Sequence, residues 1–342
     1  MINTKIFAHL QETSDQASRM KATSKEDLLS VLESLQSCPT LNEYICQAKG
    51  NDWPGAIPSS KEPITSAIQI ERRRMPLVAV DGSQIYPDLR SPVRWSYVQA
   101  VAYHLGERPQ LFSDFHSMNG MNLSLEELKG IVGGWRSALE MKAAAASARP
   151  GLLVLMDGSL LPWLSESRLD REASEYRQKL ISTRPHLIAG IISSPRSRLI
   201  SRLSALVLKT NLMIMDLEFM QALLSPGQRS ATFLHGSPHN TRFIHEKAGI
   251  HFFFMRINVQ EIVRVEIPQW IAHNPDLVNQ VAGVILEDSR MTGYSYTLSQ
   301  AHHHAAISKD ISRQLQEQAI ARYYLQTGRP PYTSAKNRAK SA

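Results

Sequence analysis

The hydrophobic pattern predicts strands and helices that alternate from about residue 76 onward. Short apolar runs of strand length are separated by longer segments with apolar residues at helical spacing. Two further strands, the first rich in aromatic and β-branched residues, are expected to form a hairpin. Strands are predicted at residues 76–80, 94–105, 109–114, 152–156, 186–193, 251–257 and 262–268, helices at 124–148, 168–183 and 196–208, and one or two helices over 296–326. This alternation predicts an α/β fold with a mixed sheet flanked by helices.

The first 75 residues have a different residue pattern, which predicts an N-terminal helical arm with a linker. Residues 24–35 begin with a Ser and carry leucines at helical spacing, whereas residues 48–63 are rich in Gly, Pro and Ser. Residues 76–326 are expected to form one α/β domain that ends in helices, and residues 327–342 a basic, disordered tail.

Composition narrows the class of protein. Of 342 residues, 43% are hydrophobic and 20% charged, as in ordinary soluble globular proteins. The apolar runs are far below the roughly 18 residues that cross a bilayer, and the N-terminus lacks a signal-type apolar core, so we expect a cytoplasmic protein without membrane contact. Cys38 and Cys46 fit no zinc or redox pattern and are expected to be free thiols. The net charge of +7 makes a polyanion a plausible partner.

Two of the predicted strands run into the same tripeptide, Asp-Gly-Ser. The stretches "VAVDGS" and "VLMDGS" place Asp81 and Asp157 where each apolar run ends, and Gly82 and Gly158 allow a sharp turn there. Carboxylates at the carboxyl ends of neighbouring strands face each other, and a divalent cation relieves their repulsion. The alternative is that Asp-Gly is a turn dipeptide with a Ser cap. Two copies, each after an apolar strand, favour the cation site.

The helix between these stretches supplies a third candidate carboxylate. Ser124 and Glu127 have the spacing of a capping box, and Glu126 lies in the same first turn. Glu140 is flanked by apolar and small residues, which is typical of a position near the buried side of a helix. A surface Glu paired with Arg136 four residues earlier explains the same pattern equally well.

Three carboxylates that hold one or two divalent ions are typical of sites that hydrolyse phosphodiesters. One ion activates water and another stabilises the leaving oxygen, with the ions about 3.5–4 Å apart. The chain offers neither a G-x-S-x-G motif nor a P-loop. A phosphohydrolase that forms an aspartyl-phosphate is a weaker alternative, because Asp81 and Asp157 are each followed by Gly-Ser and not by a second Asp two residues on.

Histidines and arginines add candidates for handling phosphate. His302, His303 and His304 follow one another on a predicted helix and point about 100° apart, so only one can reach a given site. His302 could contact a phosphate or carry a proton there. Arg196 and Arg198 fall at a strand-to-helix junction, where contacts with a nucleic-acid backbone are natural.

The order "VAVDGS", helix Glu, "VLMDGSL" and "GYSYTLSQAHHHAAIS" resembles the NurA nuclease family, over roughly residues 76–310. The resemblance implies an RNase H-like core, a ring-shaped homodimer, and a nuclease that depends on Mn²⁺ (or Mg²⁺). It also implies 5′-to-3′ degradation of DNA, cleavage of single strands, and DNA-end processing with a HerA-type hexameric ATPase. By motif position, Asp81, Glu140 and Asp157 match the family's metal-binding carboxylates, and His302 matches the His of its C-terminal helix.

The chain departs from the family at two places. Where family members often carry a Lys after a strand, this chain has residues 193–195 (Ser-Ser-Pro), and Arg196 is the nearest base. The family's Tyr near the late strand is replaced by residues 252–254 (Phe-Phe-Phe), and Tyr294 is the nearest alternative. We therefore expect Arg196, Arg198 and Tyr294 to contact DNA. The competing hypothesis is a non-catalytic DNA-end clamp or assembly subunit of the same fold, which loss of a carboxylate would favour; all three are present.

Overall fold

The computed structural model describes most of the α/β region and parts of the N-terminal segment. The described residues are 25–38, 55–59, 62–70, 75–88, 91, 93–118, 124–161, 175–176, 180–181, 186–209, 214–236, 240 and 249–328. The predicted basic tail, most of the helix expected over 168–183, and Cys46 lie outside these ranges, whereas Cys38 is in a reduced, half-buried position.

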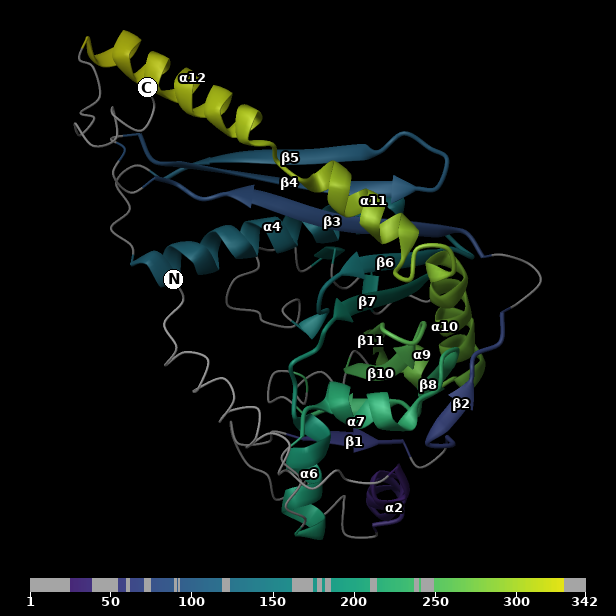
Figure 1. Ribbon diagram of the computed structural model, residues 1–342. Helices are drawn as coiled ribbons and strands as arrows, with labels where there is room; N and C mark the ends of the chain where they lie inside the picture. The colour runs from purple at the N-terminus through teal and green to yellow at the C-terminus, as the bar shows by residue number, and fades with distance from the viewer. Residues whose placement is uncertain are drawn as a thin grey trace, which may run out of the picture.

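Among the described residues, one mixed sheet of eleven strands organises the fold, with the order β1-β9-β10-β11-β7-β6-β3-β4-β5 and with β2 and β8 joined beside β10 (Figure 1). The strands are β1 Ala56–Pro58, β2 Thr65–Ala67, β3 Leu77–Ile85, β4 Trp95–His104, β5 Gln110–Ser117, β6 Leu153–Asp157, β7 Leu187–Ser193, β8 Gln228–Ser230, β9 Phe233–His235, β10 Ile250–Arg256 and β11 Ile262–Pro268. The helices are α2 Lys25–Gln36, α4 Leu125–Ser147, α6 Leu199–Leu208, α7 Asp216–Leu223, α9 Gln269–Ala272, α10 Pro275–Ser289, α11 Tyr296–Ala305 and α12 Lys309–Thr327.

The strands around the two Asp-Gly-Ser stretches have the RNase H-like arrangement that the resemblance implies. β3, β4 and β5 form consecutive antiparallel pairs, and β6 and β7 continue the sheet in parallel with β3. The arrowheads of β3 and β6 in Figure 1 point to the same side, so the two strands direct their carboxyl ends to one edge. The predicted mixed sheet flanked by helices is therefore confirmed.

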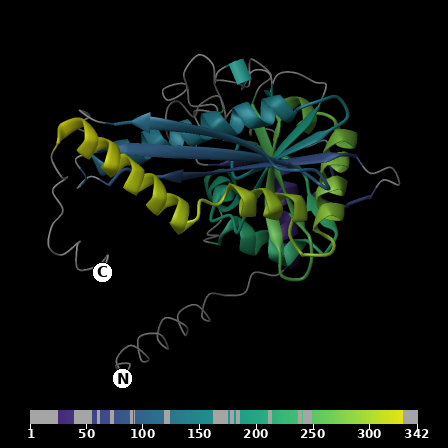
Figure 2. The same cartoon turned by 90° about the horizontal axis from the view of Figure 1, so that it is seen from above.

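Helices cover both faces of this sheet, as the view from above shows (Figure 2). α4 packs its apolar stripe against one face of β3 and β4, where Val78 and Val80 are buried beside Met141. α10 and α11 cover the opposite face, where Ala79 and Leu155 are buried beside Ala301. Side chains along each strand thus point alternately to the two faces of the sheet. This alternation determines which face the polar residues further along each strand point to.

The structure differs from the sequence expectation in several places. Two short strands, β1 and β2, form within the segment expected to be arm and linker, and they pair with β9 and β8. α2 buries its leucines in a core shared with α6 and α7, so it is not a peripheral helix. Strands as short as β1 and β2 carry too few residues for a periodic signal. The boundary between an arm and a domain near residue 75 stays a prediction.

Two further differences concern helices. The long C-terminal segment forms two helices, because Ala306 is extended at the C-cap of α11 and Ser308 caps α12 through its side chain. α10 has Asn274 as its N-cap and Pro275 as its first residue, signals that typify a helix start, yet the sequence analysis did not identify it. Among the described residues, no helix combines the length and apolar character that crossing a membrane requires.

Candidate metal centre

Asp81 lies in the middle of β3, four residues before its end. The expectation that the first Asp-Gly-Ser stretch ends a strand is therefore wrong. Residues 78–85 pair with β4 without interruption, and this pairing carries the strand past the Asp-Gly turn signal. The Asp81 side chain is only 8% exposed. Since it shares the strand face of Ala79, it points toward the helices that cover that face.

Asp157 is the last residue of β6, as predicted. β6 pairs in parallel with β3 through Val80 and Met156, which brings the two aspartates to adjacent positions on neighbouring strands. The Asp157 side chain is about one-third exposed (34%). Gly158 then turns the chain with φ +101°, a conformation that favours glycine.

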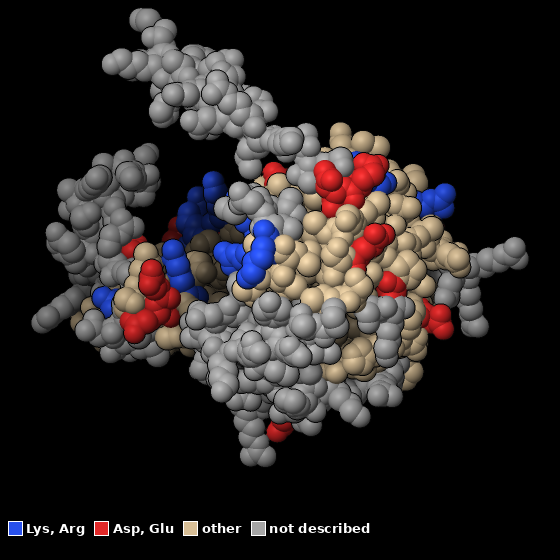
Figure 3. Space-filling view, turned by 90° about the horizontal axis from the view of Figure 1, so that it is seen from below, with Lys and Arg blue, Asp and Glu red and all other residues tan. Residues whose placement is uncertain are grey.

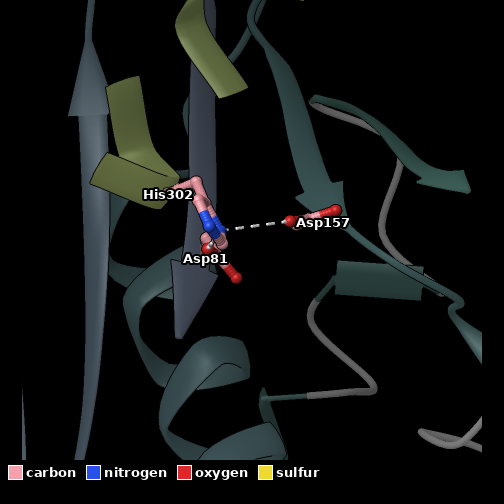
Figure 4. Close-up of side chains that lie close together, drawn as sticks. All are labelled: Asp81, Asp157 and His302. Carbon is pink, nitrogen blue, oxygen red and sulfur yellow. Dashed lines mark hydrogen bonds and ion pairs between the residues drawn. The ribbon is translucent and has the colours of Figure 1, made fainter. Parts of the chain in front are cut away.

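His302 completes the group from α11, which lies over this face of the sheet. Its Nδ1 is 2.7 Å from Asp81 Oδ2 and 3.8 Å from Asp157 Oδ2. Figure 4 shows the imidazole directed at both carboxylates. One potential ligand atom from each of the three residues lies within 4.8 Å of the others. The ring is 71% exposed, so its other edge is open to solvent. His303 and His304 point elsewhere, and His304 stacks on Tyr103.

Contacts at both ends of α11 position His302. Ser295 caps the first turn, and the buried Asp288 accepts hydrogen bonds from Ser295 Oγ (2.6 Å) and from Thr297 N (3.1 Å) and Oγ1 (2.7 Å). At the other end, Gln99 Nε2 donates to the Ala305 carbonyl at 2.7 Å. Neither Asp288 nor Gln99 is recognisable from the sequence as a partner of α11, since no local pattern marks a partner on another element.

Glu140 approaches from α4, on the other face of the sheet. Its side chain is 8% exposed and packs against Gly82, where a Cβ atom would lie 2.5 Å from Glu140 Oε1. Arg136 Nε lies 3.3 Å from the same oxygen. Glu140 is therefore buried, as the flanking residues indicated. The alternative of a surface Glu is wrong in its exposure, although the pairing with Arg136 that it proposed is present. Gly82 is needed here for close approach and not for the turn that the sequence suggested.

The carboxylates strongly influence one another. Burial raises the pKa of Glu140 to about 8; Arg136 opposes the rise, and the charges of Asp81 and Asp157 add to it. Burial likewise raises the pKa of Asp157 to about 6, with a further rise from Asp81 and opposition from His302 and Arg136. Ionising all three carboxyl groups at this edge is therefore unfavourable without a further positive charge, and a bound cation supplies that charge.

The donor set suits a hard divalent cation. Carboxylate oxygens with one imidazole nitrogen are ligands that Mn²⁺ accepts, and carboxylates also bind Mg²⁺. Asp81, Asp157 and His302 fit a shared ion by distance. Glu140 is not part of that close group, but it is near enough for the charges of Asp81 and Asp157 to raise its pKa.

The residues predicted to contact DNA lie on two separate segments, one before α11 and one between β7 and α6. Tyr294 is half-buried just before α11; burial, followed by the charges of Asp157, Glu261 and Asp81, raises its pKa. Arg196 and Arg198 are exposed in the segment between β7 and α6. That segment follows the strand on which Ile191 pairs with Asp157. On the face seen from below, Lys and Arg side chains gather around a hollow (Figure 3).

Residues 75–307 match the family described as the NurA domain. Among solved structures, the NurA nuclease from Sulfolobus solfataricus is similar to this chain with a TM-score of 0.56 and 14% identity, covering 95% of this chain and 98% of that one. A second NurA crystal structure has a TM-score of 0.54 and 13% identity, with coverage of 94% and 98%. A NurA structure with manganese has a TM-score of 0.50 and 13% identity, with coverage of 85% and 95%. No protein with curated annotation matches.

Proposed function

This chain belongs to the NurA family of nucleases, and from that premise we propose that it is a divalent-metal-dependent deoxyribonuclease whose catalytic centre consists of Asp81, Glu140, Asp157 and His302. The observation that carries the proposal is the convergence of two carboxylates and an imidazole within 4.8 Å, from elements far apart in the sequence. The structure with manganese of a NurA protein supports Mn²⁺ as the ion, and Mg²⁺ is the alternative.

The residues of the proposed catalytic centre have separate roles. Asp81 and Asp157 hold the cation, and Glu140 neutralises it from the α4 side. When bound, a divalent ion activates water and stabilises the charge that develops on the phosphate during hydrolysis. His302 is held at Asp81 through Nδ1, which leaves the outer edge of its ring to orient or protonate a phosphate oxygen. Arg196, Arg198 and Tyr294 hold the DNA strand next to this centre.

A test of the centre uses end-labelled linear DNA with Mn²⁺, with Mg²⁺ and with EDTA. We expect cleavage with Mn²⁺, none with EDTA, and loss of the Mn²⁺-stimulated activity in Asp157→Asn. Asp276→Asn is the matched control, because Asp276 is exposed in the first turn of α10. Circular dichroism verifies that both variants are folded. An Asp157→Asn enzyme as fast as the wild type excludes the metal role of Asp157, and DNA binding without cleavage in the wild type favours the end-clamp hypothesis.

The proposed activity on DNA is 5′-to-3′ degradation of ends together with cleavage of single strands, in end processing with a HerA-type hexameric ATPase. The family membership supports this assignment. Substrates labelled at either end give the polarity. Adding a purified HerA-type hexamer with ATP tests the partnership: we expect faster and more processive degradation, and unchanged degradation contradicts it.

The proposed homodimer has support in one exposed surface. β5 is an edge strand of the described sheet and is exposed along most of its length, with Leu111 60% and Phe115 52% exposed. α12, which extends away from the body in Figure 1, has no buried residue among its described positions although it carries Ile311, Tyr324 and Leu325. An apolar, unpaired edge strand is a template for pairing with another chain. We propose that a second copy covers this surface.

Light scattering after size exclusion tests the dimer. Leu111→Lys should shift the protein toward monomer, whereas Val259→Lys, at a 70% exposed position in the turn before β11, should leave the mass unchanged. A Leu111→Lys protein that stays dimeric places the contact elsewhere.

A further inference from the structure

Glu266 is a fully buried carboxylate on β11 that contacts the second Asp-Gly-Ser stretch. Its side chain has no exposed surface. Glu266 Oε2 accepts a hydrogen bond from Ser159 Oγ at 2.7 Å and another from the Leu160 backbone N–H at 2.8 Å. Because Ser159 and Leu160 follow Asp157 within three residues, this one carboxylate oxygen holds the loop that carries Asp157.

The backbone on the other side of this loop is equally close. Gly190 on β7 pairs with Glu266, and a Cβ atom at Gly190 would lie 2.5 Å from the Gly158 carbonyl oxygen. The Gly158 N–H donates to the Ile191 carbonyl at 2.8 Å. The loop is therefore packed onto β7 by its backbone and tied to β11 by Glu266, so small movements of the loop are resisted from two directions.

The second oxygen of Glu266 belongs to a buried ion pair. Arg264 Nη2 donates to Glu266 Oε1 at 2.7 Å, and Arg264 Nη1 donates to Ser197 Oγ at 3.4 Å. Ser197 Oγ in turn donates to Asp216 Oδ2 at 2.6 Å. The network thus extends from the loop of Asp157 to the segment between β7 and α6, which carries Arg196 and Arg198.

The two Asp-Gly-Ser stretches differ in how they are held. In the first, Ser83 is still paired with Gln99 of β4, so backbone ladder bonds on both sides of Asp81 fix its position. Asp157 is the last residue of its strand and is partly exposed. Beyond Asp157 the Gly158–Ile191 backbone bond still reaches β7, but no further residue of β6 pairs with a neighbouring strand among the described residues, and Glu266 supplies the next anchor of the loop.

We propose that Glu266 is a positioning residue that holds Asp157 at the metal centre through Ser159 and Leu160. This inference rests on the proposed function, because it assigns Glu266 to the binding of that cation. Partners that orient a metal ligand typically change metal affinity about 10–100-fold when they are lost. The effect should appear in cation affinity and not in the rate at saturating cation, since the ligand itself remains.

The test measures Mn²⁺ affinity by calorimetry, alongside cleavage rates as a function of Mn²⁺ concentration and melting temperatures without metal. Glu266→Gln leaves Arg264 without its ion-pair partner in the interior, so failure to fold is a foreseeable result. Ser159→Ala is therefore the second variant: it removes one hydrogen bond and leaves Glu266 paired with Arg264 and Leu160. Ser83→Ala is the matched control from the first stretch, and Ser159→Thr restores the hydroxyl.

We expect Ser159→Ala to weaken Mn²⁺ binding about tenfold, with the rate at saturating Mn²⁺ within about twofold of the wild type and the melting temperature within about 2 °C. Ser83→Ala should match the wild type, and Ser159→Thr should recover much of the affinity. Unchanged affinity in Ser159→Ala, or a loss that only follows a lowered melting temperature, overturns the positioning role alone. A wild type that binds no Mn²⁺ overturns the proposed function and this inference with it.

Discussion

Binding of Mn²⁺ should release about one proton at pH 7, and Glu140 should be its source. Burial raises the pKa of Glu140 from 4.5 to about 8, with Arg136 opposing and Asp81 and Asp157 adding to the rise. The rise in the pKa to about 8 is equivalent to about 5 kcal/mol against ionisation without metal. A cation bound near these carboxylates reverses that balance. Its positive charge stabilises the ionised form of Glu140, and at this buried position water screens the attraction only weakly.

The number of protons follows from the pKa values. At pH 7 a group with a pKa of about 8 is about 0.9 protonated, and Asp157, with a pKa of about 6, is about 0.1 protonated. Ionising both on binding therefore releases about one proton per ion. Because deprotonation favours binding, the apparent affinity should rise almost tenfold per pH unit between pH 6 and 8, and level off above the pKa of Glu140.

Calorimetric titrations in buffers of different ionisation enthalpy measure this number directly as the slope of the observed heat against buffer enthalpy. The wild type should give a slope near one proton at pH 7 and near zero at pH 9. Glu140→Gln, which keeps the side-chain volume but cannot ionise, should give only about 0.1 proton at pH 7. A wild-type slope near zero at pH 7, or a full proton from Glu140→Gln, excludes Glu140 as the source of the proton.

Three further outcomes are expected. Gly82→Ala places a methyl group 2.5 Å from Glu140 Oε1, so it should cost about 1–3 kcal/mol of stability and weaken Mn²⁺ binding. The control is Gly133→Ala, which lies in open space on the same helix as Glu140 and should be neutral or stabilising in thermal melts. Burial lowers the pKa of His251 from 6.5 to about 3, so its neutral form favours the folded state fully above pH 6.5, and about 2 kcal/mol should be lost by pH 5; His251→Gln should flatten this acid-side decline, and an unchanged decline contradicts it. Arg196→Ala should weaken DNA binding at all sequences and reduce the salt slope by about one unit, and an unchanged slope excludes a phosphate contact.

The local sequence pattern predicted the structure correctly where the role of a residue depends only on its neighbours in the chain. The capping box of Ser124 and Glu127 forms as predicted, with both reciprocal hydrogen bonds present, because caps depend on neighbours within one turn. The small apolar residues around Glu140 correctly indicated a buried position. The pattern could not distinguish burial from pairing with Arg136, since the same helical spacing serves both.

The same kind of reasoning failed where a residue's role depends on a distant partner. Gly82 was interpreted as a turn residue, yet it lies inside β3 and makes room for Glu140. Glu266 lies in the run "IVRVEIP", where charged and apolar residues alternate as they would on a half-exposed strand. In the fold both faces of β11 are covered, so Glu266 and Arg264 are enclosed and pair with each other.

The amino-acid order is sufficient to place a carboxylate at or near the end of each apolar run and a histidine on a late helix, because strand and helix periodicities and cap chemistry are short-range properties. Bringing ligand atoms of Asp81, Asp157 and His302 within 4.8 Å of one another depends on the tertiary structure. The parallel pairing of β3 with β6 sets Asp81 beside Asp157, and the contacts of Asp288 and Gln99 set α11 over them. The β3–β6 pairing joins residues 76 positions apart and the Gln99–Ala305 contact joins residues 206 positions apart. At such separations the free energy depends on packing of the whole sheet, and no local pattern carries the information.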